Sequence, residues 1–279
     1  MPYMGSKRKL ANKIVDKILL DNPNTKYAYD LFGGGGAISF ELLQRAQIQK
    51  VHYNELNSGV VALLQDIRNN GVTDKYFQWI NRETFMKHKK DDDWFGGLCK
   101  VVWSFGNNQN DYLFGKKIEA LKKEAHDYLI DNGYLEDRTK RIPLIKEFKQ
   151  KALLDGRFEL ERLERLQQLE RLQRLQQLER LQQLQQLELS NLSYCDVIID
   201  TPIDETIIYL DPPYLNTGKY AEELVHSELY EYIKNSKYKI YLSSYESDLT
   251  CVLEMEHRST LSSVVNIKTI EKLFTNNML

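Results

Sequence analysis

The sequence predicts an α/β protein with a doubly wound, mostly parallel sheet and a long, mainly helical insertion. Two observations lead to this prediction. Segments of strand and helix character alternate over residues 7–70, and the same alternation returns at 197–242. Between these parts, at about 71–190, the alternation stops. Alternating strands and helices typically form a parallel sheet with helices on both faces, so the middle part is expected to be inserted into one α/β domain.

In the first part, an amphipathic helix is followed by two strand–helix units. Leu10, Ile14 and Ile18 have the three-to-four spacing of a helix with one apolar face. A short apolar strand then ends in four consecutive glycines. The expected elements are a helix at 7–20, a strand at 27–32, a helix at 37–46, a strand at 50–54 and a helix at about 58–70.

The last part resumes the alternation. Three short apolar segments are expected to form strands, and a helix is expected between the last two of them. The expected elements are strands at 197–199, 206–210 and 238–242, with a helix at about 221–235. We expect the catalytic domain to comprise residues 1–60 and 190–279, with residues 61–189 as the insertion.

The insertion contains a low-complexity repeat at 160–189, in which leucine recurs at every third position from Leu160 to Leu187. Leu, Gln, Glu and Arg favour a helix, and neither Gly nor Pro interrupts 157–189. A spacing of three does not match the 3.5-residue period of a coiled coil. A solenoid-like coil and a tolerated repeat expansion remain open as alternatives. Self-association through this repeat is a further hypothesis.

Composition excludes several classes of protein. The 279 residues carry a net charge of -2, and no segment has the roughly 20 apolar residues of a membrane span. We therefore expect no membrane partner, and a nucleic-acid-binding surface would have to be local. Three widely spaced cysteines and five histidines without ligand spacing predict no metal site, and the cysteine usage suits a reducing cytoplasm.

The glycine loop is the first motif with chemical content. Phe32 is followed by glycines at 33–36, between a predicted strand and a predicted helix. Glycines allow a ligand to approach the backbone closely, and the helix N-terminus offers unpaired N–H groups. Glu55 ends the next strand, where nucleotide-binding units carry the carboxylate that accepts the ribose hydroxyls. The sequence therefore predicts a nucleotide site at this edge of the sheet.

The second motif is Asp211, Pro212, Pro213 and Tyr214, at the end of a predicted strand. Two prolines after the aspartate prevent the strand from continuing. The Asp211 carboxylate, the Pro212 carbonyl and the Tyr214 ring are thus expected at the carboxyl edge of the sheet, where ligands bind in open α/β folds.

These two motifs together resemble the signature of amino-group methyltransferases. With the N-terminal PYMGSK, the chain resembles the Dam-like DNA adenine methyltransferases, of the type with a DPPY motif. The order of motifs also resembles that family: opening lysine, glycine loop, acid, recognition insertion, DPPY. The chain departs from the family pattern at Tyr3 (Trp in some members), Leu31 (commonly Pro) and Glu55 (commonly Asp).

The resemblance implies a Rossmann-like methyltransferase fold that binds S-adenosylmethionine and methylates adenine in a specific double-stranded DNA sequence. Such DNA methylation is also the activity found in restriction–modification systems. The implied catalytic residues are Asp211 and Pro212, which accept the N–H bonds of the target amino group, and Tyr214, which stacks on the flipped base. A bacterial or phage-infected cytoplasm is the implied location.

The resemblance also implies a set of binding residues. The amides of the insertion are implied to read base edges, and an aromatic or amide side chain to fill the gap left by a flipped base. The implied cofactor-binding residues are Tyr3, Lys7, Asp30, Phe32, Gly34, Gly36, Glu55, Ser193, Tyr194 and Asp211, and the implied DNA-binding residues are Asn107, Asn108, Gln109 and Tyr112.

Two alternatives remain open. The same chemistry could act on the amino group of cytosine, on RNA or on a protein glutamine. Alternatively, the chain could be a non-catalytic module that binds DNA or a partner, with the leucine repeat as its interaction arm.

Overall fold

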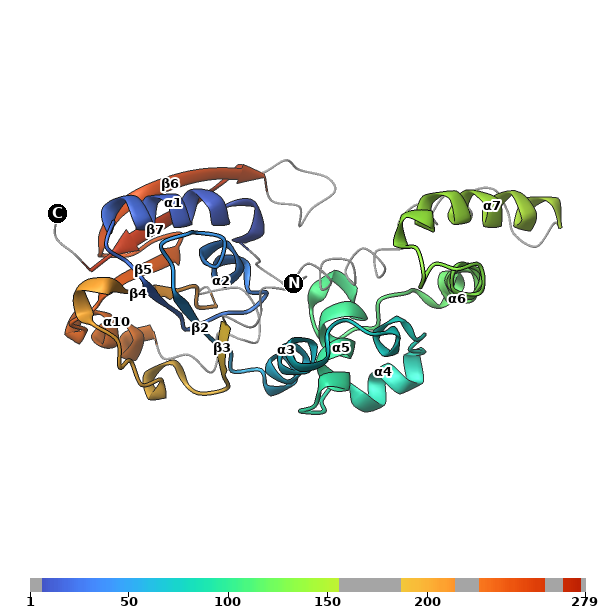
Figure 1. The fold of residues 1–279 in the computed structure, drawn as a ribbon, viewed down its shortest axis with the longest axis horizontal. Helices are drawn as coiled ribbons and strands as arrows, with labels where there is room; N and C mark the ends of the chain where they lie inside the picture. Colours follow the sequence, from blue (N-terminus) through green and yellow to red (C-terminus); the bar gives the residue numbers. More distant parts are fainter. Residues whose placement is uncertain (1–6, 156–186, 214–225, 259–267, 277–279) are drawn as a thin grey trace. The chain divides into compact units, whose positions relative to one another are not determined.

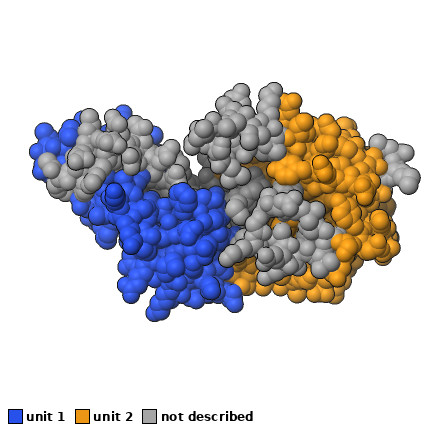
Figure 2. Space-filling view, turned by 180° about the vertical axis from the view of Figure 1, so that it is seen from behind, with its two compact units in different colours: residues 1–4, 62–181 blue, residues 5–61, 182–279 orange. Residues whose placement is uncertain are grey.

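The structure is a computed structural model that describes residues 7–155, 187–213, 226–258 and 268–276. Contacts between Cα atoms divide the chain into two compact units, which Figure 2 shows in different colours. Unit 1 contains Met1–Met4 and Ala62–Leu181, and unit 2 contains Gly5–Val61 and Gln182–Leu279. In the described parts of the chain, no helix combines the length and the apolar character needed to cross a membrane.

Unit 2 is built on a seven-stranded sheet with the strand order β3-β2-β1-β4-β5-β7-β6 (Figure 1). The first five strands in this order run parallel, and β7 pairs antiparallel with both β5 and β6. The strands are β1 (Tyr27–Asp30), β2 (Lys50–Asn54), β3 (Leu187–Ser190), β4 (Thr206–Leu210), β5 (Lys239–Ser244), β6 (Thr250–Arg258) and β7 (Lys268–Thr275). The predicted mixed α/β fold is confirmed.

Helices cover both faces of this sheet. Successive side chains of a strand point to opposite faces. Ile208 and Ile240 pack with Leu229 and Ile233 of α10 (His226–Asn235), so α10 covers one face. On the opposite face lie α1 (Ala11–Asp21) and α2 (Ala37–Leu42), preceded by the 3₁₀-helix η1 (Lys7–Lys9). Figure 1 shows α1 and α10 on opposite sides of the strands.

Two buried hydrogen bonds connect the second face to its helices. Asn22, which ends α1, donates to the Tyr241 hydroxyl of β5 at 2.7 Å. Ser39 of α2 donates to Asp30 at the end of β1 at 2.6 Å. Asp30, Tyr209 and Tyr241 therefore face α1 and α2, and this face holds the polar side chains of the site described below.

The end of the leucine repeat forms a strand instead of a helix. Leu187–Ser190 is β3, which pairs parallel with β2 at the edge of the sheet. Leu187 is buried and Glu188 is exposed, so the chain here follows the two-residue period of a strand. Pairing with β2 outweighs the helix propensity of these residues. Residues 160–186 of the repeat lie outside the described residues.

The strand expected at 197–199 is wrong. This segment has no regular structure, although Val197 is buried and packs into the core below α10. β4, the next strand along the chain, already pairs with β1 and β5 on its two sides. The Ile199 carbonyl instead accepts a hydrogen bond from the Tyr238 hydroxyl at 3.0 Å.

The antiparallel hairpin of β6 and β7 was not expected from the sequence. It adds two strands beyond β5, with Tyr241 of β5 beside Thr275 of β7. Leu273 and Phe274 of β7 are buried, on opposite faces of the sheet. The hairpin therefore completes the core of unit 2 beyond the parallel strands.

The described part of unit 1 consists of helices and the turns between them. α3 spans the point where the chain passes from unit 2 to unit 1. The α-helices are α3 (Ser58–Asn70), α4 (Arg82–His88), α5 (Trp94–Val102), α6 (Lys116–Asp131) and α7 (Arg141–Leu154). Their core is rich in aromatic side chains: the Trp79 ring stacks on Phe114 and meets Trp103 edge-on.

Candidate functional site

The glycine loop forms a tight turn between β1 and α2. Gly36 precedes α2 with φ +72°, a left-handed conformation in which a side chain would be strained. A Cβ atom on Gly33 would lie 2.2 Å from the Tyr53 ring, so this position also requires glycine. The Tyr53 hydroxyl donates to the Gly34 carbonyl at 2.7 Å. The sequence thus folds here into a loop whose backbone is held against β2.

Glu55 fixes the same loop from the end of β2. One carboxylate oxygen accepts a hydrogen bond from the Gly34 N–H at 2.8 Å, and the other accepts one from the Asn57 N–H at 2.9 Å. The side chain therefore lies beside the glycine loop, at the place predicted for a ribose-binding carboxylate. Its orientation is set by the backbone before any ligand is present.

Buried Asn54 ties three strand ends together. Its amide nitrogen donates to the carbonyls of Leu31 and Leu192 at 3.1 and 2.9 Å, and its oxygen accepts from the Ser190 hydroxyl at 2.6 Å. These bonds hold the segment after β3 against the ends of β1 and β2. The sequence analysis did not identify Asn54.

Asp30 is a carboxyl group at the end of β1 with an unusual environment. It is 1% exposed, and burial is the main reason why its pKa is raised to about 7. The negative charges of Asp211 and Glu55 raise the pKa further, whereas the hydrogen bond from Ser39 opposes the change. Among the described residues, its buried Oδ1 atom has no hydrogen-bond partner. A cationic group of a ligand would satisfy this atom and favour the ionised form.

Asp211 and Pro212 follow β4 at the carboxyl edge of the sheet. The Lys7 ammonium lies 2.8 Å from Asp211 Oδ1 and 3.5 Å from Glu271 Oε1. Burial lowers the pKa of Lys7, but its charge interactions and hydrogen bonds with both carboxylates outweigh this effect and leave the pKa raised. Lys7 is therefore a buried cation, and the adjacent Pro212 is also buried.

A stack of aromatic rings borders the glycine loop. Phe32 stacks on Tyr194 with ring centroids 5.3 Å apart, and Tyr232 of α10 meets Tyr194 edge-on. Tyr194 begins a short 3₁₀-helix, with Ser193 in the position before it. Phe32 and Tyr194, far apart in sequence, thus share one apolar surface beside the loop.

The predicted DNA-binding residues lie in unit 1, on a turn between α5 and α6. Ser104 and Tyr112 form an isolated antiparallel bridge that closes the base of this turn. Gly106, Asn107 and Gln109 all have φ near +60°. The Asn108 side chain accepts hydrogen bonds from the N–H groups of residues 110 and 111, both at 2.9 Å. The turn is therefore held in one shape by its own hydrogen bonds.

Four side chains of this turn differ in what they can contact. Asn107 and Gln109 are half-buried, and Phe105, which the sequence analysis did not consider, is 63% exposed. Tyr112 is only 6% exposed: its hydroxyl donates to the Ile80 carbonyl, and its ring packs on Trp103. Tyr112 thus belongs to the core that supports the turn.

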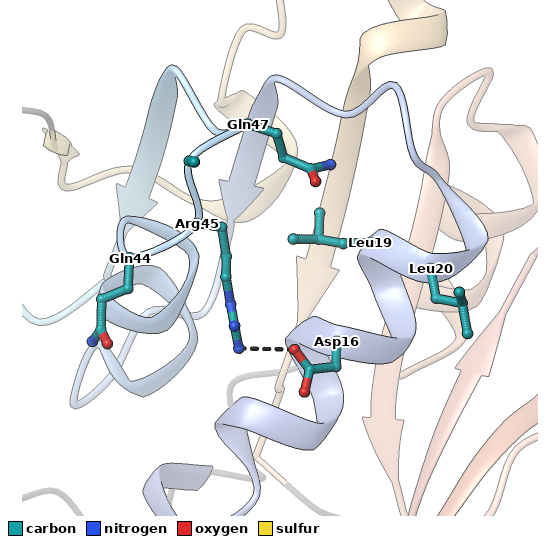
Figure 3. Close-up of a pocket in the computed structure, with 7 residues that line it drawn as sticks. Asp16, Leu19, Leu20, Gln44, Arg45 and Gln47 are labelled. Carbon is teal, nitrogen blue, oxygen red and sulfur yellow. Dashed lines mark ion pairs between the residues drawn. The ribbon is translucent and has the colours of Figure 1, made fainter.

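A separate hollow of about 620 Å³ lies at the opposite edge of the sheet (Figure 3). It is bordered by the C-terminal half of α1 and by residues 44–47, which connect α2 to β2. Arg45 points across it toward Asp16, and the two side chains form an ion pair at 2.9 Å. Glu41 also pairs with Arg45, so this cation is already neutralised within the protein. The hollow is separate from the glycine loop and from Asp211.

The structure therefore brings together most of the residues predicted for the catalytic domain. Tyr3 and Tyr214 lie outside the described residues. Glu271 was missed, and the signal available for it was the alternation of β7, which places Glu271 and Leu273 on one face. The residues at the ends of β1, β2 and β4 are Asp30, Phe32, Gly34, Gly36, Glu55, Asp211 and Pro212.

Comparison with known families identifies this arrangement. The family model for the D12 class of N6 adenine-specific DNA methyltransferases matches residues 3–275. A comparison with curated proteins gives no match. The family match spans nearly the whole chain and includes the glycine loop, the turn at 104–112 and the Asp211 motif. It confirms the resemblance to the Dam-like adenine methyltransferases and favours adenine in DNA as the methyl acceptor over the alternatives left open by the sequence. The chain belongs to the D12 class of N6 adenine-specific DNA methyltransferases, enzymes that methylate the amino group of adenine in DNA.

Proposed function

We propose that the chain transfers a methyl group from S-adenosylmethionine to a flipped adenine held at Asp211, Pro212 and Tyr214, in a specific sequence of double-stranded DNA. The observation that carries this proposal is the buried Lys7 ammonium, 2.8 Å from Asp211 Oδ1 at the carboxyl edge of the sheet. A carboxylate held in this way is oriented before a substrate arrives.

S-adenosylmethionine would supply an activated methyl group on a sulfonium, whose sulfur leaves as a neutral thioether when the bond to the methyl group breaks. The chain's own residues fit such a ligand at three points. Asp30 Oδ1, buried and without a partner in the described part of the chain, suits the ligand's ammonium. The Glu55 carboxylate suits the ribose hydroxyls, and the apolar surface of Phe32 and Tyr194 suits an adenine ring.

The remaining predicted cofactor residues have supporting roles in this proposal. Gly34 and Gly36 allow the ligand to approach the backbone, and Ser193 precedes the ring of Tyr194. Lys7 holds Asp211, which also lies near the methionine end of the ligand. We assign Tyr3 to the same site from the family resemblance alone.

The adenine amino group is a weak nucleophile because its lone pair is delocalised into the ring. In our proposal, the Asp211 carboxylate and the Pro212 carbonyl each accept a hydrogen bond from one of its two N–H groups. These two acceptors direct the lone pair toward the methyl group and stabilise the positive charge that develops on nitrogen. Tyr214 stacks on the base after it leaves the duplex. In this proposal the protein promotes methyl transfer by orienting the target amino group with two acceptors whose positions are fixed before the substrate binds.

We further propose that unit 2 is a Rossmann-like methyltransferase domain and that residues 62–181 of unit 1 form the target-recognition region. The predicted boundary at 189 moves because Leu187–Ser190 is β3 of the unit 2 sheet. Asn107, Asn108 and Gln109 lie on a turn held in one shape, which suits base readout by amide side chains. Exposed Phe105 offers an apolar face for an unstacked base step. We assign Tyr112 the role of supporting this turn, because its side chain is packed. A DNA substrate makes the cytoplasm of a bacterium or of a phage-infected cell the expected place of action.

Tritiated methyl transfer from S-adenosylmethionine to double-stranded DNA tests the proposal. The wild type is compared with Asp211→Asn, and the product is digested to nucleosides. We expect N6-methyladenine from the wild type and a loss of at least about 100-fold in the variant, since one acceptor of a developing charge is removed. Asp200→Asn, an exposed carboxylate on the other face of the sheet, is the matched control. Transfer by Asp211→Asn at the wild-type rate would refute the assigned role of Asp211.

A further inference from the structure

Lys7 stands between two carboxylates that differ in their access to solvent. The Lys7 side chain is 5% exposed and that of Glu271 is 2% exposed, whereas the Asp211 side chain is 19% exposed. A substrate can therefore reach Asp211 but not the two residues beneath it. The buried residues Lys7 and Glu271 therefore hold the accessible Asp211 carboxylate in place through the ion pair of Lys7 with Asp211.

The three residues come from separate parts of the fold. Lys7 lies on η1 before α1, Asp211 follows β4, and Glu271 lies on β7 of the C-terminal hairpin. Ser244, the last residue of β5, pairs with Lys272. The preceding residue of β7, Glu271, therefore lies at the edge of the sheet where β4 and β5 end. The antiparallel hairpin thus delivers a carboxylate to the carboxyl edge of the parallel strands.

We propose that Glu271 is a positioning residue for methyl transfer, which holds the Lys7 ammonium beside Asp211 and shares its charge. This inference rests on the role proposed above for Asp211. Glu271 itself does not touch the substrate, because it is buried behind Lys7.

Sharing one ammonium between two carboxylates has a consequence for Asp211 as an acceptor. If Glu271 carried no charge, the whole positive charge of Lys7 would be balanced by Asp211. The Asp211 carboxylate would then be more stabilised as an anion and a weaker acceptor for the N–H bond of the target amino group. With Glu271 ionised, part of the attraction of Lys7 is directed away from Asp211. The buried Glu271 therefore sets how strongly Asp211 can accept.

Other titratable groups also act on Asp211 and enter the pH profile. Asp30 and Tyr209 interact with its charge from β1 and β4, and Tyr245, after β5, interacts with Asp211, Lys7 and Glu271. Burial raises the pKa of both tyrosines. Both hydroxyls therefore stay neutral in the acid range, so Asp30 is the further group that must be controlled. Saturating S-adenosylmethionine keeps the Asp30 site filled at every pH.

The test measures single-turnover methyl transfer against pH for the full-length chain, with Glu271→Gln and Glu271→Asp as variants. Gln keeps the shape of the side chain and removes its charge, and Asp keeps the charge. Glu254→Gln is the matched control, because it makes the same change on the same hairpin at an exposed residue paired with Lys272.

For Glu271→Gln we expect the rate of methyl transfer to fall about tenfold. We also expect the acid limb of the pH profile to shift to lower pH by about 1 unit. For Glu271→Asp we expect the limb to stay at its wild-type position, and this variant is decisive if the Gln variant does not fold.

A rate for Glu271→Gln within about twofold of wild type at every pH would overturn the inference. A slower rate for Glu271→Gln with the acid limb of the pH profile at its wild-type position would also overturn it, because this result indicates a structural role. An acid limb that shifts in Glu271→Asp would overturn it as well. The Asp211→Asn variant separates the two failures. If it remains active, the proposed role of Asp211 fails, whereas if it is inactive and Glu271→Gln is normal, only this inference fails.

Discussion

The pKa of Asp30 leads to a quantitative prediction for cofactor binding. At a pKa of about 7, most molecules carry a neutral Asp30 below neutral pH. Binding of a cationic ligand at Oδ1 requires the ionised form, so the apparent affinity is reduced by the fraction of protein that is protonated. The apparent affinity is proportional to the ionised fraction of Asp30. This fraction is about 3% at pH 5.5 and about 50% at pH 7.0, so the affinity for S-adenosylmethionine should rise roughly 16-fold over this range.

Isothermal titration calorimetry at pH 5.5, 6.0, 6.5 and 7.0 measures this rise. The range lies below the usual pKa of an α-amino group, so the ligand's ammonium stays charged. At pH 7.0, titrations in buffers of different ionisation enthalpy should show release of about half a proton. Asp30→Asn should bind more weakly and with an affinity that does not depend on pH. Ser39→Ala removes the hydrogen bond that opposes the raised pKa, so its profile should move to higher pH.

The same group should affect stability with the opposite trend. A carboxyl group whose pKa is raised in the folded state binds protons more tightly there than in the unfolded chain. The stability of the ligand-free protein should therefore fall as the pH rises from about 4 to about 7. Asp30→Asn should melt at a higher temperature than wild type at pH 8, although it binds the ligand more weakly. Wild-type affinity that stays constant from pH 5.5 to 7.0, or an Asp30→Asn variant with unchanged affinity, would refute the assignment of Asp30 to the ligand's ammonium.

Three further variants test other parts of the structure. Gly36→Ala should lower the melting temperature and abolish ligand binding, because a side chain at φ +72° costs about 1–2 kcal/mol and its Cβ would lie 2.3 Å from the Phe40 ring; calorimetry would contradict this if binding persisted. Asn54→Ala should destabilise the fold by about 1–3 kcal/mol in urea unfolding, because the buried Leu31 carbonyl and the partly buried Leu192 carbonyl lose their donor, and an unchanged midpoint would be the contrary result. Asn107→Ala should weaken DNA binding in fluorescence anisotropy with an unchanged melting temperature, whereas Tyr112→Phe should lower the melting temperature by losing the bond to Ile80; equal effects of both variants on stability would contradict the division of roles.

The sequence predicted the parts of the fold whose signals are local. Helix α3 was expected at 58–70 and spans Ser58–Asn70, and β4 was expected at 206–210 and spans Thr206–Leu210. The helix has a clear helical period and the strand is a continuous apolar run, and both segments lie next to turn residues. The glycine loop was likewise predictable, since strand, glycines and helix follow one another directly. The ends of β1, β2 and β4 then had to meet at one edge, because these strands run parallel.

The errors come from interactions between distant segments. Leu187–Ser190 has the composition of a helix, and only the free edge of β2 makes it a strand. Residues 197–199 form a short apolar run like that of a strand, but β4, the next strand along the chain, already pairs with β1 and β5. Local sequence determines what a segment can form. Which hydrogen-bonding edges remain available is determined by the rest of the sheet.

The same reasoning explains why the candidate site was predicted only in part. Asp211 and Glu55 were found because each stands directly after a strand, where the chain must turn and expose a polar side chain. Glu271 lies inside a strand and reaches the site only because β7 runs antiparallel beside β5. In a parallel β7, the residues near its start would lie at the opposite edge of the sheet, far from Lys7. The reversal of one strand therefore converts an ordinary strand residue into the second partner of a buried ammonium. Which residues reach this site therefore depends on the motifs at the ends of the parallel strands and also on the direction of the strand that follows β5 in the sheet.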